Sequence, residues 1–328
     1  MLSLFRTNQL LANLLLIVYV AILFAHTFVV DTSIPHSQEG IISYLLYQYL
    51  PFGSTLGIVL TIFILFIQAF IINYIAVEHK IQSEVNLFPG LFYLLVAGSM
   101  PQFTSMSPLH FANLFYLLAL LNLYTVYNNP KSASPIYNIG IWLGLASLFY
   151  SSYLLLILFA FMGLQILRAF SLKERFMVIF GMLTPYVLLG VYLFWNDRLD
   201  FFIDYQFIKN LGFTDFSIIR NWQSINFEPL IFMAFFVIAG IFSYNIQIAR
   251  KTREIQKKVN ILYWMLFLSI PTLFFQKGMA YDHLLILSIP LGILISGIFN
   301  KISKSWAELI HLLFLAIVLF LHFRPVIF

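Results

Sequence analysis

The sequence contains no cysteine and very little charge. Of its 328 residues, only 9% are Asp, Glu, Lys or Arg, whereas 61% are hydrophobic. The absence of cysteine excludes disulfides, thiolate metal sites and cysteine nucleophiles. A soluble domain carries about 25% charged residues, so this chain has too few polar side chains to cover a surface that faces water.

Long hydrophobic runs are abundant instead. Runs of about 20 residues recur along the chain, and a helix of that length crosses a hydrocarbon core about 30 Å thick. Continuous runs favour helices over a β-barrel, which needs short alternating segments. We therefore predict an all-α, polytopic transmembrane bundle forming a single integral membrane domain over residues 1–328. The predicted spans, about eleven in number, cover residues 10–30, 55–77, 87–100, 110–127, 135–151, 152–170, 177–195, 229–248, 261–275, 284–299 and 309–323.

The distribution of basic residues predicts the orientation of the bundle. With a cytoplasmic N-terminus, most of the 18 Lys and Arg residues lie inside, including the run ARKTREIQKK at 249–258. A single span over 135–170 would place that run outside, so we predict two spans with a turn at 150–152. The C-terminus is then outside. The first helix is interpreted as a retained span because no small-residue cleavage site follows it. We expect a multi-pass protein of a bacterial plasma (inner) membrane.

Two outer loops are long enough to hold structure. Loop 31–54 contains GIISYLLYQYLP, whose apolar and tyrosine residues predict a short interfacial helix. Loop 196–228 mixes acids, cations and aromatic residues, which is typical of segments lying flat on a membrane. The predicted inner face has only short connectors and the basic run at 249–258, so we expect any chemistry on the outer face.

Motifs of soluble enzymes are missing. The sequence has no Walker loop, dinucleotide fingerprint, HExxH or nucleophile elbow, and its seven histidines show no ligand spacing. We therefore predict no metal ligands from the sequence. The cofactor stays unknown, and a divalent metal ion is compatible with the sequence. The basic residues lie in short loops between spans, so nucleic acid is not an expected partner. Membrane lipids are expected partners, and the run at 249–258 is a candidate docking site for a protein partner.

Three stretches carry a resemblance to a known superfamily. Asp31 directly follows the first span and opens an outer loop, and residues 136–164 form a glycine-bearing pair of apolar segments. Lys277, Tyr281 and His283 precede LLILSIPLGILISG. Together these stretches resemble the GT-C fold membrane glycosyltransferases that use polyprenol-phosphate sugars. In that superfamily an acid in the first outer loop is usually the catalytic base or a metal-site acid.

The resemblance implies a GT-C-like enzyme that transfers a sugar from a polyprenyl-phosphate donor to an envelope acceptor on the outer face. The chain departs from the pattern at Thr32, where a second acid would pair with Asp31. It departs again at Phe149 and Tyr150, where a lysine is common. The chain also resembles an uncharacterised bacterial family of polytopic membrane proteins.

Sugar transfer from a lipid phosphate needs a carboxylate that orients or deprotonates the acceptor and cations that stabilise the departing phosphate. Asp31 is the first candidate for the carboxylate and Glu39 the second. The candidates for binding phosphate or sugar hydroxyls are Lys277, Tyr281, His283, Arg198 and Arg220. We expect Asp31, Lys277 and His283 to line one cavity that opens sideways to lipid.

Simpler interpretations stay open for the same residues. Asp31 is also explained as the end of a span at the water interface, and Lys277 as an interfacial lysine whose stem lies along apolar surface. We expect Asp282 and His283 at the water-facing end of a span, with little burial, and Pro290 as a bend inside that span. A non-catalytic membrane subunit or lipid-binding scaffold of an envelope assembly is the alternative function, followed by a transporter or flippase.

Overall fold

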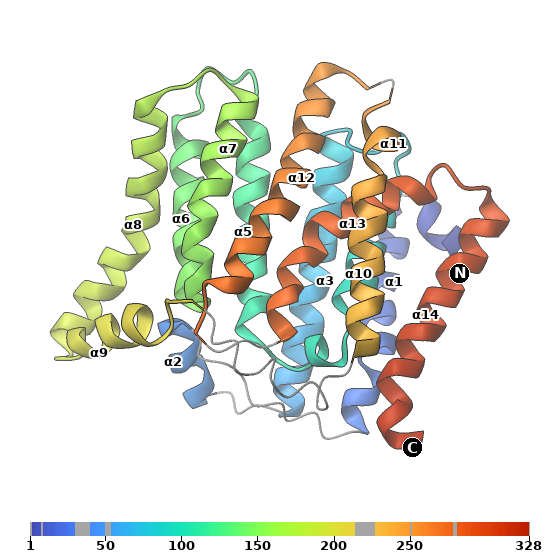
Figure 1. The fold of residues 1–328 in the computed structure, drawn as a ribbon, viewed down its shortest axis with the longest axis horizontal. Helices are drawn as coiled ribbons and strands as arrows, with labels where there is room; N and C mark the ends of the chain where they lie inside the picture. The colour runs from blue at the N-terminus through green and yellow to red at the C-terminus, as the bar shows by residue number, and fades with distance from the viewer. Residues whose placement is uncertain are drawn as a thin grey trace.

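The computed structural model describes residues 2–7, 9–29, 40–49, 54–213, 227–249, 251–277 and 281–327. These residues are helical apart from their connections and one isolated antiparallel bridge between Leu211 and Gln276 (Figure 1). The α-helices are α1 (Leu10–Leu23), α2 (Ile41–Tyr49), α3 (Thr55–Glu78), α4 (Phe88–Ala97), α5 (Pro108–Thr125), α6 (Ala133–Phe149), α7 (Ile157–Leu167), α8 (Leu172–Trp195), α9 (Leu199–Ile203), α10 (Phe227–Phe242), α11 (Tyr244–Ile248), α12 (Arg253–Phe274), α13 (Ser288–Phe299) and α14 (Lys304–Ile327). Short 3₁₀ segments are η1 (Leu2–Arg6), η2 (Ala25–Phe28), η3 (Pro101–Thr104), η4 (Ser151–Leu156) and η8 (Tyr281–Leu287), and η5 (Asp204–Lys209) is a π-helix.

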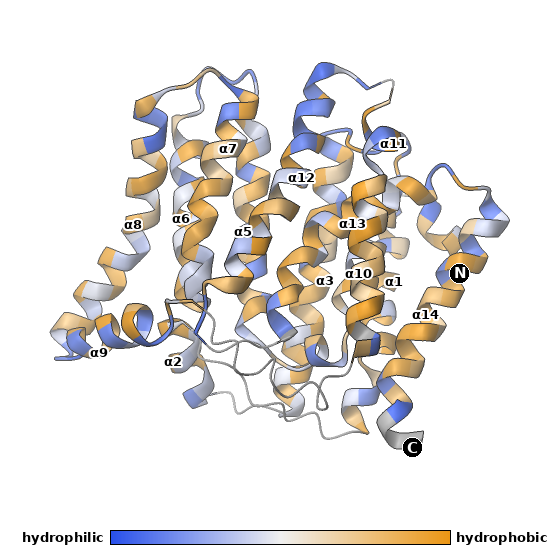
Figure 2. Ribbon diagram, viewed as in Figure 1, coloured by the Kyte–Doolittle hydropathy of each residue, from blue (hydrophilic) through white to orange (hydrophobic). Residues whose placement is uncertain are grey.

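The all-α class is confirmed. Among the described residues, α3, α8, the η8–α13 segment and α14 are long and apolar enough to cross a membrane. Shorter apolar helices occupy other ranges that the hydrophobic runs indicated, such as Leu10–Leu23 and Ala133–Phe149. Figure 2 shows hydrophobic residues over the middle of the bundle and hydrophilic residues concentrated toward its two ends. Four helices therefore support a membrane protein by length and composition.

The long apolar stretch 135–170 is interrupted where the charge distribution required a turn. Helix α6 ends at Phe149, and Tyr150 takes an extended conformation with φ −141° and ψ 104°. The 3₁₀ segment η4 follows and leads into α7. An extended residue breaks the i to i−4 hydrogen-bond series, so the stretch forms two helices rather than one.

Pro290 lies close to a change of helix type, and the bend that we expected there stays a prediction. Residues 281–287 form the 3₁₀ segment η8, and α13 begins only at Ser288. Pro290 therefore lies in the first turn of α13, three residues after the end of the 3₁₀ segment. The first turn of an α-helix is where proline is best tolerated.

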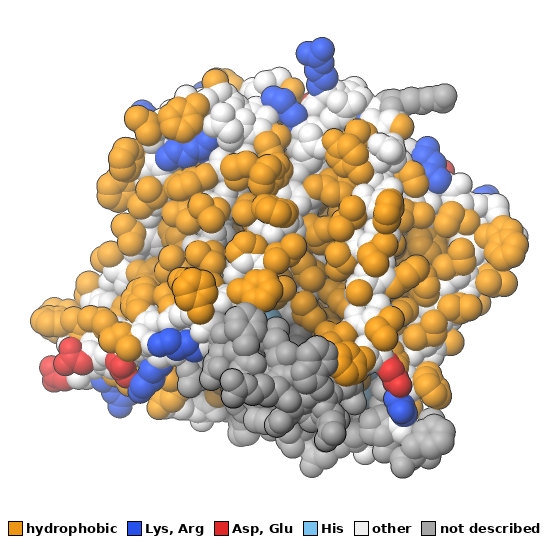
Figure 3. All heavy atoms as spheres, in the orientation of Figure 1, with side chains coloured by type: hydrophobic (Ala, Val, Ile, Leu, Met, Phe, Trp, Pro, Cys, Tyr) orange, Lys and Arg blue, Asp and Glu red, His pale blue; other side chains and the backbone are white. Residues whose placement is uncertain are grey.

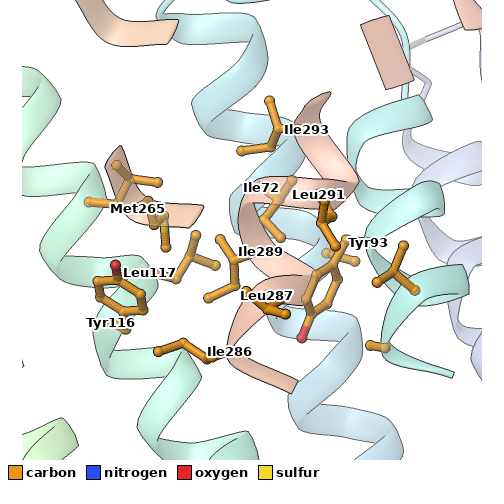
Figure 4. Packing of buried hydrophobic residues seen from close by; sticks show 14 of the residues in the cluster. Ile72, Tyr93, Tyr116, Leu117, Met265, Ile286, Leu287, Ile289, Leu291 and Ile293 are labelled. Atoms are coloured by element: carbon orange, nitrogen blue, oxygen red, sulfur yellow. The ribbon is translucent and has the colours of Figure 1, made fainter. Parts of the chain in front are cut away.

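Helices α4 and α13 form the centre of the bundle. Every residue of α4 is buried. In the η8–α13 segment, Asp282–Phe299, 89% of the apolar residue stretch is buried inside the protein, whereas the corresponding share is 28% in α8 and in α14. Gly292 of α13 lies against Tyr93 of α4, because a Cβ at position 292 would approach the Tyr93 Cα to 2.6 Å. The close-up of the core shows Tyr93 beside Leu291 and Leu287 (Figure 4). Helices α4 and α13 are thus shielded inside the bundle, whereas α8 and α14 face outward.

Helices α6 and α8 cross at glycine residues. A Cβ added at Gly140 would lie 2.2 Å from the carbonyl oxygen of Val178, and one at Gly181 would lie 2.2 Å from that of Tyr137. Gly144 makes a similar approach to Met182. Small residues four apart let two helix backbones come into contact, which is a common way to join helices in membranes. The glycines of the sequence GIWLG therefore join α6 to α8.

Contacts between connections define two ends of the bundle. The basic end comprises connections 79–87, 126–132, 168–171, 249–252 and 300–303. Arg168 donates to the Asn129 carbonyl across this end, Lys251 donates to the Ile81 carbonyl, and Asn300 donates to Gln82 Oε1 over 2.9 Å. The opposite end carries α2, α9 and η8, and it lies at the bottom of Figure 1. The spans are proposed from the sequence, but the separation of the two ends is a property of the fold.

Candidate functional site

A buried carboxylate lies at the opposite end. Asp282 begins the segment that leads into α13 and is only 5% exposed. Ser107, the N-cap of α5, donates from Oγ to Asp282 Oδ2 over 3.3 Å, and its Oγ accepts from the Leu109 N–H. A buried ionised group needs such partners because transfer of a charge from water is costly. Ser107 therefore links the cap of α5 to the acid of η8.

His283 lies beside aromatic residues in the same region. Its side chain is 4% exposed, and its ring is 5.1 Å from the Tyr150 ring in an edge-to-face arrangement. Tyr153, in η4, donates to Asn113 of α5, and Asn113 donates to the Leu285 carbonyl of η8. Asp282 and His283 are thus buried rather than exposed to water, because α5 and η4 cover them.

Lys277 lies outside this buried group and contacts a different element. Its Nζ donates to the Ile208 carbonyl over 2.8 Å, and its backbone N–H donates to the Asn210 carbonyl over 3.0 Å. The stem of Lys277 packs on Gly212, which has φ +151°, a conformation that favours glycine. Lys277 therefore fastens the end of the α9–η5 segment.

The segments expected to lie on the membrane surface are pinned to α6. Gln206 of η5 is fully buried, donates to the Ser147 carbonyl over 2.8 Å and accepts from the Ile41 N–H over 2.9 Å. The Gly40 N–H donates to the Phe149 carbonyl over 2.9 Å. Helix α9 runs across the axis of the long helices, and α2 lies near it (Figure 1). One amide side chain therefore connects α2, η5 and α6.

The candidate residues predicted from the sequence do not form one group among the described residues. Arg198 is exposed at the N-cap of α9, whereas Lys277 contacts the far end of the α9–η5 segment. The two cations therefore lie at opposite ends of the α9–η5 segment. Tyr281 opens η8, and its side chain lies outside the description. Asp31, Glu39 and Arg220 also lie outside the described residues, so the shared cavity stays a prediction.

An apolar groove lies between α10 and α14. Its volume is about 780 Å³, and an ion pair between Arg324 and Glu228 stands at one end. The groove is lined by these two residues with Ile231, Phe232, Phe235, Phe314, Ile317, Phe320 and Leu321. In Figure 3 an Asp or Glu and a Lys or Arg side chain lie together at the lower right, at the end opposite the basic end. The groove is apolar along its length and charged at one end, and a single-chain lipid has the same arrangement of apolar tail and charged headgroup.

Metal ligands do not gather within the described part of the chain. No group of three His, Asp or Glu side chains there is close enough to hold an ion. The rings of His26 and His322 lie 4.2 Å apart between centroids. His26 forms a hydrogen bond with the Thr104 hydroxyl, and His322 forms one with the Leu23 carbonyl. A divalent metal with Asp31 or Glu39 stays a prediction, since those acids lie outside the described residues.

Sequence reasoning missed Ser107 and Gln206. Ser107 had a visible signal, because serine before proline at the start of an apolar run is a helix N-cap pattern. Gln206 had none, since a single amide among aromatic residues gives no indication of which backbone groups it will reach. Tyr150 was recognised as part of a turn, and its contact with His283 depends on the tertiary structure.

The fold and this site define a class: an α-helical bundle whose described part contains four helices long and apolar enough to cross a membrane, with polar groups collected at its ends. The chain belongs to a family of unknown function (DUF6427), whose model matches residues 38–327. No curated protein and no solved structure matches the chain.

Proposed function

We propose that this is an eleven-span protein of a bacterial plasma membrane that transfers a sugar from a polyprenyl-phosphate donor at its outer face. One observation carries the proposal. A carboxylate, an imidazole and a phenol, from Asp282, His283 and Tyr150, meet at the same end as the short helices α2 and α9. The resemblance of the first outer loop and of residues 277–297 to GT-C glycosyltransferases supports the same reaction.

The residues have distinct proposed roles. Asp31 orients or deprotonates the acceptor, with Glu39 as the second candidate. Lys277 is exposed at the surface, so its ammonium group can exchange the Ile208 carbonyl for a phosphate oxygen. The groove between α10 and α14 holds the polyprenyl chain, with its charged end toward the headgroups.

The test is a transfer assay with purified protein and a panel of polyprenyl-phosphate sugars. We expect Asp31→Asn to lower the transfer rate at least about 100-fold, the usual contribution of a general base. Asp200→Asn, at an exposed acid of α9, is the matched control and should keep the wild-type rate. Wild-type activity in Asp31→Asn would reject Asp31 as the base, and no transfer with any donor would reject the enzyme.

A second candidate function is a non-catalytic, lipid-binding subunit of an envelope assembly. This function is favoured because the polar groups already have hydrogen-bond partners within the protein. Lys277 donates to a backbone carbonyl, and Asp282 accepts from Ser107. Native mass spectrometry of the purified protein would then find a retained polyprenyl phosphate without transfer. Ile231→Trp, which fills the groove, should release that lipid, whereas Ile241→Trp, exposed on another side of α10, should not.

A further inference from the structure

A second, chemically different pocket opens at the basic end. Its volume is about 670 Å³, and Lys80, Lys251 and Lys301 line it. These three cations come from three separate connections, after α3, after α11 and after α13. The other polar lining residues are Gln82, Ser83, Asn245, Gln247 and Thr252. No Asp or Glu stands among the lining residues in the described part of the chain.

The fold holds two of the lysines in place. Lys251 donates from Nζ to the Ile81 carbonyl, which fixes its side chain across the pocket. Lys80 has φ 52°, in the left-handed region that favours glycine, and the Ile81 N–H donates back to the Ala76 carbonyl over 3.0 Å. This is the usual way to terminate a helix, except that lysine occupies the glycine position. The backbone that carries Lys80 is therefore fixed, and its exposed side chain lines the pocket.

The wall of the pocket beside α13 is built from amide side chains. Gln82 donates to the Ile293 carbonyl over 2.9 Å and to Ser296 Oγ over 2.8 Å. Gln247 is buried and donates to the Leu294 carbonyl over 2.8 Å. Gly297 makes room for it, since a Cβ there would lie 1.8 Å from Gln247 Nε2. These bonds fix the wall, so the pocket is an ordered part of the fold.

The positive charges of Lys251 and Lys301 repel each other across this pocket. The pKa of Lys251 is lowered to about 8, mainly by burial and secondly by the charge of Lys301. Both effects disfavour the protonated lysine, and both are offset when an anion enters. The uncompensated positive charge of the pocket therefore indicates a negatively charged ligand.

We propose that the pocket lined by Lys80, Lys251 and Lys301 binds a phosphate group. Three ammonium groups suit a phosphate, which offers several oxygen acceptors, and amide and hydroxyl groups complete the lining. The phosphate is that of an anionic phospholipid headgroup or of a soluble phosphate compound. The site lies at the end away from the proposed transfer site and is independent of that function.

The test compares two triple variants of the full chain with equal loss of charge. The pocket variant is Lys80→Gln, Lys251→Gln, Lys301→Gln, and the control variant is Lys131→Gln, Lys173→Gln, Lys304→Gln. The control residues are exposed residues of the connections or helix starts at the basic end and do not line the pocket. Native mass spectrometry after exchange into cardiolipin and phosphatidylcholine micelles measures lipid retention. Thermal unfolding with and without inorganic phosphate measures the soluble ligand.

For a lipid headgroup, we expect the pocket variant to lose cardiolipin affinity about 100-fold, since each lysine near the membrane contributes about fivefold. The control variant keeps its affinity, and inorganic phosphate does not displace the lipid. For a soluble phosphate, inorganic phosphate raises the unfolding temperature of the wild type and of the control variant only. Equal cardiolipin retention and equal phosphate response in both variants would overturn the proposal and leave the lysines as partners of helix C-termini.

Discussion

At the scale of single residues, the most informative group is Lys258 with its two partners. Lys258 is 4% exposed, although it belongs to the basic run 249–258 that we predicted as a connector between spans on the inner face. Its Nζ lies 2.6 Å from Glu254 Oε1 and 3.2 Å from His79 Nδ1. Tyr124 donates to its carbonyl over 2.9 Å. The ammonium group is buried because a carboxylate one helical turn away and an imidazole from α3 compensate it.

This group predicts a pH dependence of stability. The pKa of His79 is lowered to about 4, first by burial and then by the Lys258 charge. Because the unfolded pKa is about 6.5, the unfolded chain binds more protons between those values, and the free energy of unfolding falls as pH falls. We expect a loss of at most about 2 kcal/mol from pH 7 to pH 5 from this residue, reduced by solvent screening because the imidazole is partly exposed. Unfolding of wild type and His79→Gln in detergent at both pH values measures it, and equal losses would contradict the assignment.

At the scale of elements, the joint between α6 and α8 depends on glycine. Gly140→Ala would place a methyl group 2.2 Å from the Val178 carbonyl oxygen and 2.9 Å from the Gly181 Cα, so the helices must separate. We expect a loss of about 1–3 kcal/mol, typical of overpacking. Thermal unfolding in detergent measures the change.

Gly190→Ala is the matched control for this joint. The nearest atom to a Cβ at Gly190 is Phe202 Cε1 at 3.8 Å, an ordinary contact, and position 190 lies within α8. Alanine in a helix interior is favoured over glycine by up to about 1 kcal/mol, so this variant should be as stable as the wild type or more so. Equal destabilisation of both variants would show that the close approach at Gly140 does not hold the helices together.

At the scale of the whole molecule, we predict that the two ends of the bundle face opposite sides of the membrane. The sequence has no cysteine, so a single introduced cysteine reports one position without background. Ser303→Cys lies in the connection before α14 at the basic end, and Asn196→Cys lies at the exposed turn after α8 at the opposite end. We expect a membrane-impermeant maleimide to label position 196 in intact cells and position 303 only after lysis. Labelling of both positions in intact cells would contradict a transmembrane arrangement.

The class of the fold could be predicted from the sequence because it depends on composition. Too little charge and repeated apolar runs leave helices as the favoured way to satisfy backbone groups in lipid. The turn near Tyr150 followed from where a single span would have placed the basic run. The 3₁₀ segment before Pro290 was not predicted, because sequence does not show where a 3₁₀ segment becomes an α-helix.

The sites were less predictable because they are made by distant segments. The sequence alone determined that Lys277, Asp282 and His283 stand at the mouth of an apolar segment. Only the tertiary structure decided that Asp282 meets Ser107, that Lys277 fastens η5, and that three scattered lysines line one pocket. The physical reason is range: hydrophobicity acts through local composition, whereas a hydrogen bond or a charged pocket needs atoms brought within a few ångströms by packing.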